Sequence, residues 1–312
     1  MSSRKLHLTP RDFEITFRDK LSGFVKKKII DFNFLARKLS VNERDEILLK
    51  ITNTLLNFQV IKAGKHRQLQ WERGWAENLE AIRNKNYDSL TPRYFGKYDV
   101  VRWRQEFIRP LSANFEYSML AIIEYWLFDK YLSSYKSIYE FGCGTGHNLL
   151  RVREINPKAE IFGLDWAKSS QEIIKMMSVK LSDPLLFAKN FNFFKPDKSF
   201  KLNKNSAIFT VAALEQIGED FNPFIKYLLD QKPKICIHIE PVAELLDEDN
   251  LVDFLSLLYF KKRNYLSGFL TKLRELEKKR KIKIHKAQRT FIGSLYIEGY
   301  AVIIWSPRME KR

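Results

Sequence analysis

Cysteine is scarce in this chain, and long apolar runs are absent from it. Only two cysteines, Cys143 and Cys236, occur among 312 residues, so we expect no disulfide framework and a reducing, cytoplasmic location. No stretch of eighteen apolar residues occurs, which argues against a membrane span, and the charged N-terminus lacks the apolar core of a secretory signal. Histidine, cysteine and acidic residues do not cluster at metal-ligand spacing, so no metal is expected.

Acidic residues are outnumbered by basic ones. The chain has 54 Lys and Arg against 37 Asp and Glu, a net charge of +17. Between Lys261 and Arg289, twelve basic residues accompany only two glutamates. This charge favours an anionic partner, such as nucleic acid, a nucleotide-activated sugar, a phosphate-bearing glycan or an acidic lipid. A solvated helix face, or a genome that favours lysine, predicts the same composition.

The most informative segment is YEFGCGTGHNLL, residues 139–150. A short β-branched and aromatic run contains Glu140, and glycines follow at alternate positions, Gly142, Gly144 and Gly146, before an apolar helical pattern begins. Closely spaced glycines let the backbone turn sharply and let a ligand approach its N–H groups. The junction between a strand and the next helix is where open α/β sheets bind ligands.

The spacing separates this loop from the dinucleotide-binding pattern G-x-G-x-x-G. Its third glycine comes one residue earlier than in that pattern. Glu140 precedes the loop, where its carboxylate would repel a diphosphate but attract an ammonium group. A second apolar run ends in Asp165, and an acid at the end of the next strand can accept both hydroxyls of a ribose. The two acids together predict a ligand with a ribose and an ammonium group.

These residues resemble two motifs of the class I S-adenosylmethionine-dependent methyltransferases. Glu140 and the three glycines match the first motif, and Asp165 matches the ribose-binding acid. The resemblance runs from about Ser137 through Trp305 and implies S-adenosylmethionine as the cofactor. A glycine turn in another doubly wound enzyme is the alternative.

The resemblance also implies the remaining cofactor contacts. The loop backbone, including Cys143, is expected to lie beside the amino-acid part of the cofactor, and Trp166 against the adenine. Asn192 stands where many relatives carry an acid that bonds the adenine amino group, and an amide oxygen can accept that bond too. Phe193 is expected to supply a backbone N–H and an apolar wall.

The pattern along the chain predicts an α/β fold in two parts. Apolar runs at 137–141, 160–164, 185–189, 207–212 and 234–240 alternate with helical patterns, which predicts a doubly wound, mostly parallel sheet. Residues 281–291 and 293–307 read as an antiparallel pair, and the family's seven-stranded sheet ends in an antiparallel strand. We therefore expect a helical, aromatic-rich region over 1–112, acting as a substrate cap, and a Rossmann-like methyltransferase domain over 113–312.

Aromatic and basic residues are expected to form the substrate pocket. Trp75, Tyr94 and Arg104 belong to an interleaved stretch of both types, for which an aromatic-rich domain contact is the alternative. Tyr265 and Arg289 lie near glycine bends, and Arg289 is suited to hold an anionic acceptor by a two-pronged contact. A surface arginine is the alternative for Arg289.

An alcohol acceptor has to lose its proton, so a general base is expected. Many relatives place a histidine after a Leu-Glu pair where this chain has Gln216. This weakens base catalysis from that position, and Gln216 is expected to contact the substrate instead. His238 and Glu240 lie two residues apart near the end of a strand and so share one face. We expect His238 as the base and Glu240 as its orienter or a substrate ligand; a satisfied core histidine is the alternative.

Two motifs of related enzymes are missing from the chain. It lacks the Asp/Asn-Pro-Pro-aromatic loop that methylates amino groups and the Pro-Cys nucleophile that attacks pyrimidine carbon 5. The favoured interpretation is a small-molecule O-methyltransferase. The N-terminal region and C-terminal hairpin are somewhat similar to methyltransferases found with bacterial surface-glycan synthesis. A sugar or nucleotide-linked sugar is therefore the favoured acceptor. A tRNA or rRNA methyltransferase and a non-catalytic S-adenosylmethionine-binding subunit are the alternatives, and the oligomeric state stays open.

Overall fold

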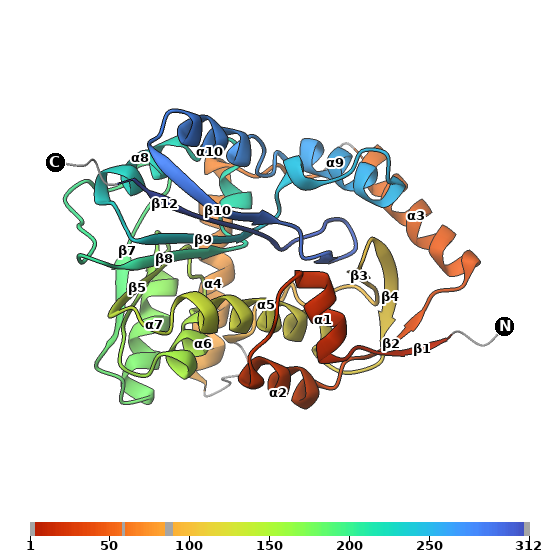
Figure 1. Cartoon of the computed structure of the whole chain (residues 1–312), viewed down its shortest axis with the longest axis horizontal. Coiled ribbons are helices and arrows are strands. Elements are labelled where there is room, and N and C mark those ends of the chain that lie inside the picture. The colour runs from red at the N-terminus through yellow and green to blue at the C-terminus, as the bar shows by residue number, and fades with distance from the viewer. Residues whose placement is uncertain (1–3, 58–59, 85–89, 309–312) are drawn as a thin grey trace.

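The computed structural model describes residues 4–57, 60–84 and 90–308 and contains two β-sheets (Figure 1). The larger sheet has seven strands in the order β10-β12-β9-β8-β5-β6-β7. Its strands are β5 (Ser137–Phe141), β6 (Glu160–Asp165), β7 (Leu186–Asn190), β8 (Ala207–Val211), β9 (Ile235–Glu240), β10 (Ile282–Gln288) and β12 (Ala301–Pro307). The five expected parallel strands are found, and each begins and ends within one residue of its predicted bounds.

The larger sheet is parallel except for one inserted strand. β5 to β9 pair in parallel, whereas β12 runs antiparallel between β9 and β10. Every residue of β5, β8 and β9 is buried, as expected for parallel strands covered on both faces. The structure therefore confirms the predicted α/β fold and its antiparallel C-terminal strand.

Helices cover both faces of this sheet (Figure 1). α5 (Phe115–Tyr131), α6 (His147–Ile155) and α7 (Lys168–Lys180) contribute to one apolar cluster, and α8 (Asn222–Gln231) and α10 (Phe269–Lys278) to the other. Successive residues of β12 alternate between the two clusters, because side chains of a strand point to opposite faces. None of the helices in the described ranges is long and apolar enough to cross a membrane.

The smaller sheet joins the N-terminal part to the C-terminal hairpin. Its order is β1-β2-β4-β3-β11, so β11 (Ile292–Gly293) from near the C-terminus pairs with β3. The N-terminal elements are β1 (Lys5–His7), α1 (Pro10–Phe17), α2 (Gly23–Phe32), β2 (Leu35–Lys38), α3 (Val41–Leu56), η1 (Lys65–Arg67), α4 (Gln68–Arg83), β3 (Val101–Trp103) and β4 (Glu106–Pro110). The helical pattern of residues 1–60 did not predict β1 and β2, which are too short to show an alternation.

The chain order reverses at β5, and this point positions the candidate site. From β5 the chain proceeds through β6 and β7 on one side, while β8 and β9 lie on the other. Ligands of open α/β sheets bind at the carboxyl ends of the strands at such a reversal. The glycine-rich loop follows β5 directly, so the fold brings it to this crevice.

Candidate active site

A cavity of about 400 Å³ lies at the carboxyl ends of β5 to β8. Seven residues expected to contact a cofactor line it: Gly142, Cys143, Gly144, Asp165, Trp166, Asn192 and Phe193. Four residues expected to contact a substrate also line it: Trp75, Tyr94, Gln216 and Tyr265. The volume lies within the range of about 300–1,000 Å³ typical of small-molecule sites.

The glycine loop adopts a backbone that only glycine accepts without strain. Gly142, Gly144 and Gly146 have φ values of 76°, 53° and 75°, in the region where a Cβ is disfavoured. A Cβ on Gly142 would stand 2.5 Å from the Cβ of Ala213. Gly142 and Gly144 face the cavity, whereas Gly146 packs against α7 through Ile174.

Asp165 ends β6 and faces the glycine loop. Its Oδ2 accepts the N–H of Gly144 at 3.0 Å, and its Oδ1 accepts the N–H of Ala167 at 2.9 Å. Burial raises the pKa of this carboxyl to about 6. A carboxylate has about four acceptor positions, so both oxygens keep capacity to accept hydroxyl groups from a ligand.

Glu140 lies behind the cavity wall rather than in it. Its side chain is fully buried, and its Oε1 accepts a hydrogen bond from Nδ2 of Asn148 at 2.7 Å. Its Oε2 has no partner, and burial raises the pKa of the carboxyl well above its usual value. Asn148 lines the cavity, so this amide lies between Glu140 and the cavity.

His147 contributes a hydrogen-bond acceptor to the same wall. The Thr145 hydroxyl donates to the carbonyl of Leu90 at 2.6 Å, so Nδ1 of His147, 3.0 Å from that hydroxyl oxygen, is the donor between them. Nε2 of His147 then carries a lone pair, and it is buried without a partner. Burial lowers the pKa of the ring well below its usual value. In the described ranges, no three His, Cys, Asp or Glu side chains gather as metal ligands.

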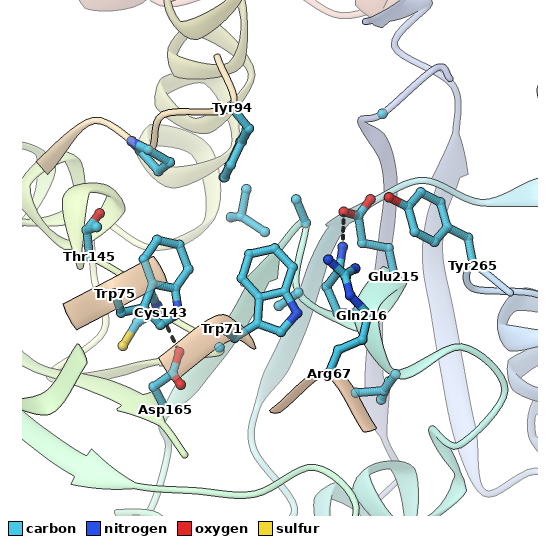
Figure 2. Close-up of a pocket in the computed structure, with 18 of the residues that line it drawn as sticks. Arg67, Trp71, Trp75, Tyr94, Cys143, Thr145, Asp165, Glu215, Gln216 and Tyr265 are labelled. Atoms are coloured by element: carbon cyan, nitrogen blue, oxygen red, sulfur yellow. Dashed lines mark hydrogen bonds between the residues drawn. The ribbon is translucent and has the colours of Figure 1, made fainter. Parts of the chain in front are cut away.

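Two tryptophans of α4 cover the cavity (Figure 2). The rings of Trp71 and Trp75 stack at 5.7 Å between centroids. Trp75 lies on the glycine loop, where a Cβ on Gly144 would be 2.9 Å from its ring. Helix α4 is anchored to α7, because Oε1 of Glu72 accepts from the Ser169 hydroxyl at 2.6 Å. In Figure 2, Trp71 lies between Asp165 and a polar group at the far end of the cavity.

This polar group contains Arg67, Glu215, Gln216, Arg263 and Tyr265, all of which line the cavity. Nη1 of Arg67 donates to Gln216 at 2.9 Å, and Nε2 of Gln216 donates to Glu215 at 2.6 Å. Burial, together with the charge of Glu240, raises the pKa of Glu215 to about 8. The N-terminal segment is fixed here by its backbone, since the N–H of Gly64 donates to the carbonyl of Gln216 at 3.0 Å.

The structure places the expected base, His238, inside the sheet and away from the cavity lining. Nε2 of His238 accepts from Nε1 of Trp305, and Nδ1 is bonded to the Thr210 hydroxyl, both at 2.9 Å. Since the indole nitrogen can only donate, the ring is neutral with its proton on Nδ1, and burial lowers its pKa to about 3. His238 is therefore placed as a satisfied core histidine, which was the stated alternative.

Glu240 has a positioning role in this structure. Its carboxylate accepts the N–H groups of Ala213, Leu214 and Glu215 at 3.1, 3.1 and 3.4 Å, and it is also bonded to Thr210. A buried polar chain thus runs from Trp305 through His238 and Thr210 to Glu240. It ends at η3 (Leu214–Ile217), the turn that carries Glu215.

Two expected substrate residues, Arg104 and Arg289, lie outside the cavity lining. Arg104 binds the N-terminal helix α1 through the Thr16 hydroxyl, at 2.8 Å, and the carbonyl of Asp12. Arg289 forms buried ion pairs with Asp253 at 2.7 Å and Glu298 at 2.5 Å. Both guanidinium groups already have protein partners, so neither prediction fits this geometry.

Arg289 is expected to contribute to stability instead. Its side chain is 9% exposed, and those of its partners Asp253 and Glu298 are 1% and 4% exposed. Arg289→Ala leaves two buried carboxylates without a counter-ion, so the free energy of unfolding is expected to fall by about 3–5 kcal/mol. Urea unfolding measures this change. The exposed Arg274 on α10 is the matched control, expected to change stability by less than about 0.5 kcal/mol when replaced by alanine.

Sequence reasoning assigned no role to several residues of the cavity, among them Arg67, Glu215 and Arg263. Glu215 had a usable signal, since it follows β8 at the end that faces the crevice and precedes Gln216. Arg67 and Arg263 had none, because their approach depends on backbone contacts between distant segments, such as the 2.6 Å bond from Ala63 to the carbonyl of Arg263.

Comparison with known proteins shows similarity in structure only. No protein-family model matches the sequence, and no curated protein matches it significantly. Human N-acetylserotonin methyltransferase, solved with S-adenosylmethionine, is 14% identical, with a TM-score of 0.49 over 86% of this chain and 68% of that one. An O-methyltransferase from neocarzinostatin biosynthesis, solved with S-adenosylmethionine and a naphthoic acid, is 12% identical, with a TM-score of 0.47 over 86% and 70%. Magnesium protoporphyrin IX methyltransferase from Synechocystis PCC 6803 is 12% identical, with a TM-score of 0.46 over 62% and 85%.

The sheet and the loop positions define the class of fold. The antiparallel strand lies between the last two strands of a parallel sheet, the glycine loop follows the central strand β5, and Asp165 ends the neighbouring strand. These features, expected from the resemblance, are present together. The sheet order, strand directions and loop positions are those that the resemblance to the class I S-adenosylmethionine-dependent methyltransferases predicts.

Proposed function

We propose that this protein transfers the methyl group of S-adenosylmethionine to an oxygen of a small molecule. The observation that carries the proposal is one cavity that joins two sets of residues. Its first end holds the glycine loop and Asp165, and its second end holds Glu215 and the aromatic side chains of the N-terminal part. A donor and an acceptor bound at the two ends would be held next to each other, which itself accelerates a reaction.

The residues at the first end fit S-adenosylmethionine. Asp165 retains acceptor capacity for ribose hydroxyls. Gly142 and Gly144 line the cavity without a Cβ, so a ligand can approach the loop backbone at these positions. The unpartnered Nε2 of His147 is an acceptor that lines the cavity, which suits a ligand with an ammonium group. Trp166 and Phe193 are the proposed walls for the adenine.

Two further contacts refine this assignment. Oδ1 of Asn192 already accepts the N–H of Phe194 at 3.0 Å, so this amide has one remaining acceptor position and its N–H₂ for the base. Trp75 lies against Gly144, so we propose that its ring covers the amino-acid part of the cofactor after a small displacement.

Glu215 is the proposed general base at the second end. The cofactor, when bound, supplies an electrophilic methyl group on a sulfonium. Glu215 lines the cavity, is held by Gln216 and has a pKa of about 8, near the range in which a base works best at neutral pH. Ionised Glu215 accepts the hydroxyl proton of the acceptor, while Glu240 holds the backbone of the turn that carries it.

The acceptor is proposed to be a ring compound, with a sugar or nucleotide-linked sugar as the candidate from the resemblance. Trp71, Tyr94, Tyr259 and Tyr265 line the second end and offer flat surfaces to a ring. Residues 1–112 are proposed as the substrate cap, because η1 and α4 supply Arg67, Trp71 and Trp75 to the cavity.

Transfer of labelled methyl groups tests the proposal. The protein is incubated with methyl-tritiated S-adenosylmethionine and, in separate arms, a small-molecule extract and total RNA from its source cells. Label is expected in the small-molecule arm and is expected to disappear with Asp165→Ala but not with Arg104→Gln. Label in RNA alone would favour the RNA alternative. A protein that binds the cofactor but labels neither fraction would favour the non-catalytic alternative.

A further inference from the structure

The buried polar atoms without partners divide the cavity into two chemically different ends. At the glycine-loop end, the one such atom on a described cavity-lining residue is Nε2 of His147, an acceptor. At the other end they are Nε2 of Gln68, Nε1 of Trp71 and Nε of Arg263, all of which are N–H donors. Three unpaired donors in one place indicate a ligand rich in acceptor atoms, because an unpaired buried donor is costly.

Two guanidinium groups share this donor-rich end. Arg67 is 8% exposed, and its Nε and Nη1 donate to Gln70 at 3.1 Å and Gln216 at 2.9 Å, both neutral amides. Arg263 donates to the carbonyl of Ile61 and to the hydroxyl of Tyr265 at 3.2 Å. Within the described part of the chain, neither guanidinium forms an ion pair.

The positive charge of this end is not balanced by the protein. Arg263 lies close enough to Arg67 to lower its pKa, after the larger effect of burial. Glu215 is the one acid that lines this end in the described ranges, so the two guanidinium groups of Arg67 and Arg263 outnumber the acidic groups there. Two neighbouring positive charges in a partly buried part of the cavity wall favour the binding of an anionic ligand.

Aromatic rings set the shape of the ligand. The guanidinium of Arg67 lies 5.1 Å from the ring centroid of Trp71, and that of Arg263 lies 5.1 Å from the ring of Tyr265. Figure 2 shows the indole nitrogen of Trp71 directed toward Arg67. A flat molecule lying along Trp71 would therefore present its end to the two arginines.

We infer that the second end of the cavity binds an acceptor with an anionic oxygen group, a carboxylate or a phosphate, on the ring that carries the methylated hydroxyl. Arg67, Arg263 and Nε1 of Trp71 donate to the anion, since guanidinium groups bind both kinds of anion by two-pronged contacts. Glu215 lies beside this group, within the same set of lining residues. The inference rests on the proposed function, because it takes the glycine-loop end as the cofactor end.

Matched ligand pairs test the inference by calorimetry in the presence of saturating S-adenosylhomocysteine. The probes are 2-hydroxybenzoate against 2-hydroxybenzamide, and phenyl phosphate against phenol. At least one anion is expected to bind tenfold or more tightly than its neutral partner, as charge-assisted hydrogen bonds predict. Preference for the carboxylate or for the phosphate identifies which anion the site takes.

Variants test which residues cause the preference for the anionic probe over its neutral partner. Arg67→Gln and Arg263→Gln are each expected to reduce it to about twofold or less while S-adenosylhomocysteine binds as to the wild type. Arg104→Gln, which removes a guanidinium outside the cavity lining, is the matched control and is expected to keep it. If a variant does not fold, as judged by loss of S-adenosylhomocysteine binding, the wild-type pairs still decide the matter.

The outcomes separate this inference from the proposed function. Suppose the wild-type protein binds S-adenosylhomocysteine but binds each anion no more tightly than its neutral partner, or binds none of the four probes. Either result overturns the inference of an anionic acceptor and leaves the proposed function standing. A wild-type protein that does not bind S-adenosylhomocysteine overturns the proposed function itself.

Discussion

Asp165→Ala is expected to weaken S-adenosylhomocysteine binding by about 10- to 100-fold. A buried hydrogen bond to a charged group contributes about 1.5–3 kcal/mol, and the variant removes the carboxylate proposed to accept the ribose hydroxyls. It also removes the acceptor that holds the N–H of Gly144 at 3.0 Å, so the glycine loop loses a fixed contact. Titration calorimetry gives both dissociation constants.

Two controls accompany this measurement. Asp31→Ala removes an exposed acid from α2 and is expected to leave the dissociation constant unchanged. Asp165→Asn keeps one acceptor oxygen and is expected to bind more tightly than the alanine variant. If Asp165→Ala melts like the wild type and binds S-adenosylhomocysteine with the same affinity, Asp165 does not hold the cofactor.

Glu215→Gln is expected to lower kcat by about 100-fold or more. General-base catalysis contributes about 10²–10⁴-fold, and the amide cannot take the proton of the acceptor. S-adenosylhomocysteine binding is expected to stay within twofold, because Glu215 lies at the opposite end of the cavity from Asp165 (Figure 2). Glu219→Gln changes an exposed acid four residues further on and serves as the control.

The pH dependence of kcat gives a second test of Glu215 as the general base. Burial raises the pKa of Glu215 to about 8, and only the ionised form accepts a proton. The wild-type rate is therefore expected to rise as pH increases through about 8, and Glu215→Gln is expected to lose this rise. A Glu215→Gln enzyme with the wild-type rate and profile would assign the base elsewhere.

Local pattern predicted the larger sheet well, for a physical reason. β5, β8 and β9 are buried on both faces, so each strand is a continuous apolar run that stands out from the amphipathic helices around it. The positions of Gly142 and Asp165 followed, because the carboxyl ends of neighbouring parallel strands meet at one edge. The structure places both at the cavity, as expected.

The catalytic candidates were harder to predict, because sharing a strand face does not bring a residue to the crevice. His238 and Glu240 alternate correctly along β9, but helices α8 and α10 cover this part of the sheet and His238 is fully buried. Arg289 pairs with Asp253 and Glu298, 36 and 9 residues away, and no local pattern indicates such partners. Arg67 reaches Glu215, through Gln216, only because the backbone of residues 63–64 is bonded to Gln216 and Arg263.

A crystal structure of the protein with S-adenosylhomocysteine tests the central claim most directly. The ligand is expected in the cavity of Figure 2, with its ribose hydroxyls on Asp165 and its amino-acid part over Gly142 and Gly144. The second end, at Arg67 and Glu215, should stay open for an acceptor. S-adenosylhomocysteine bound outside this cavity, or NADH found over the glycines in its place, would show that the glycine loop and Asp165 do not form an S-adenosylmethionine site.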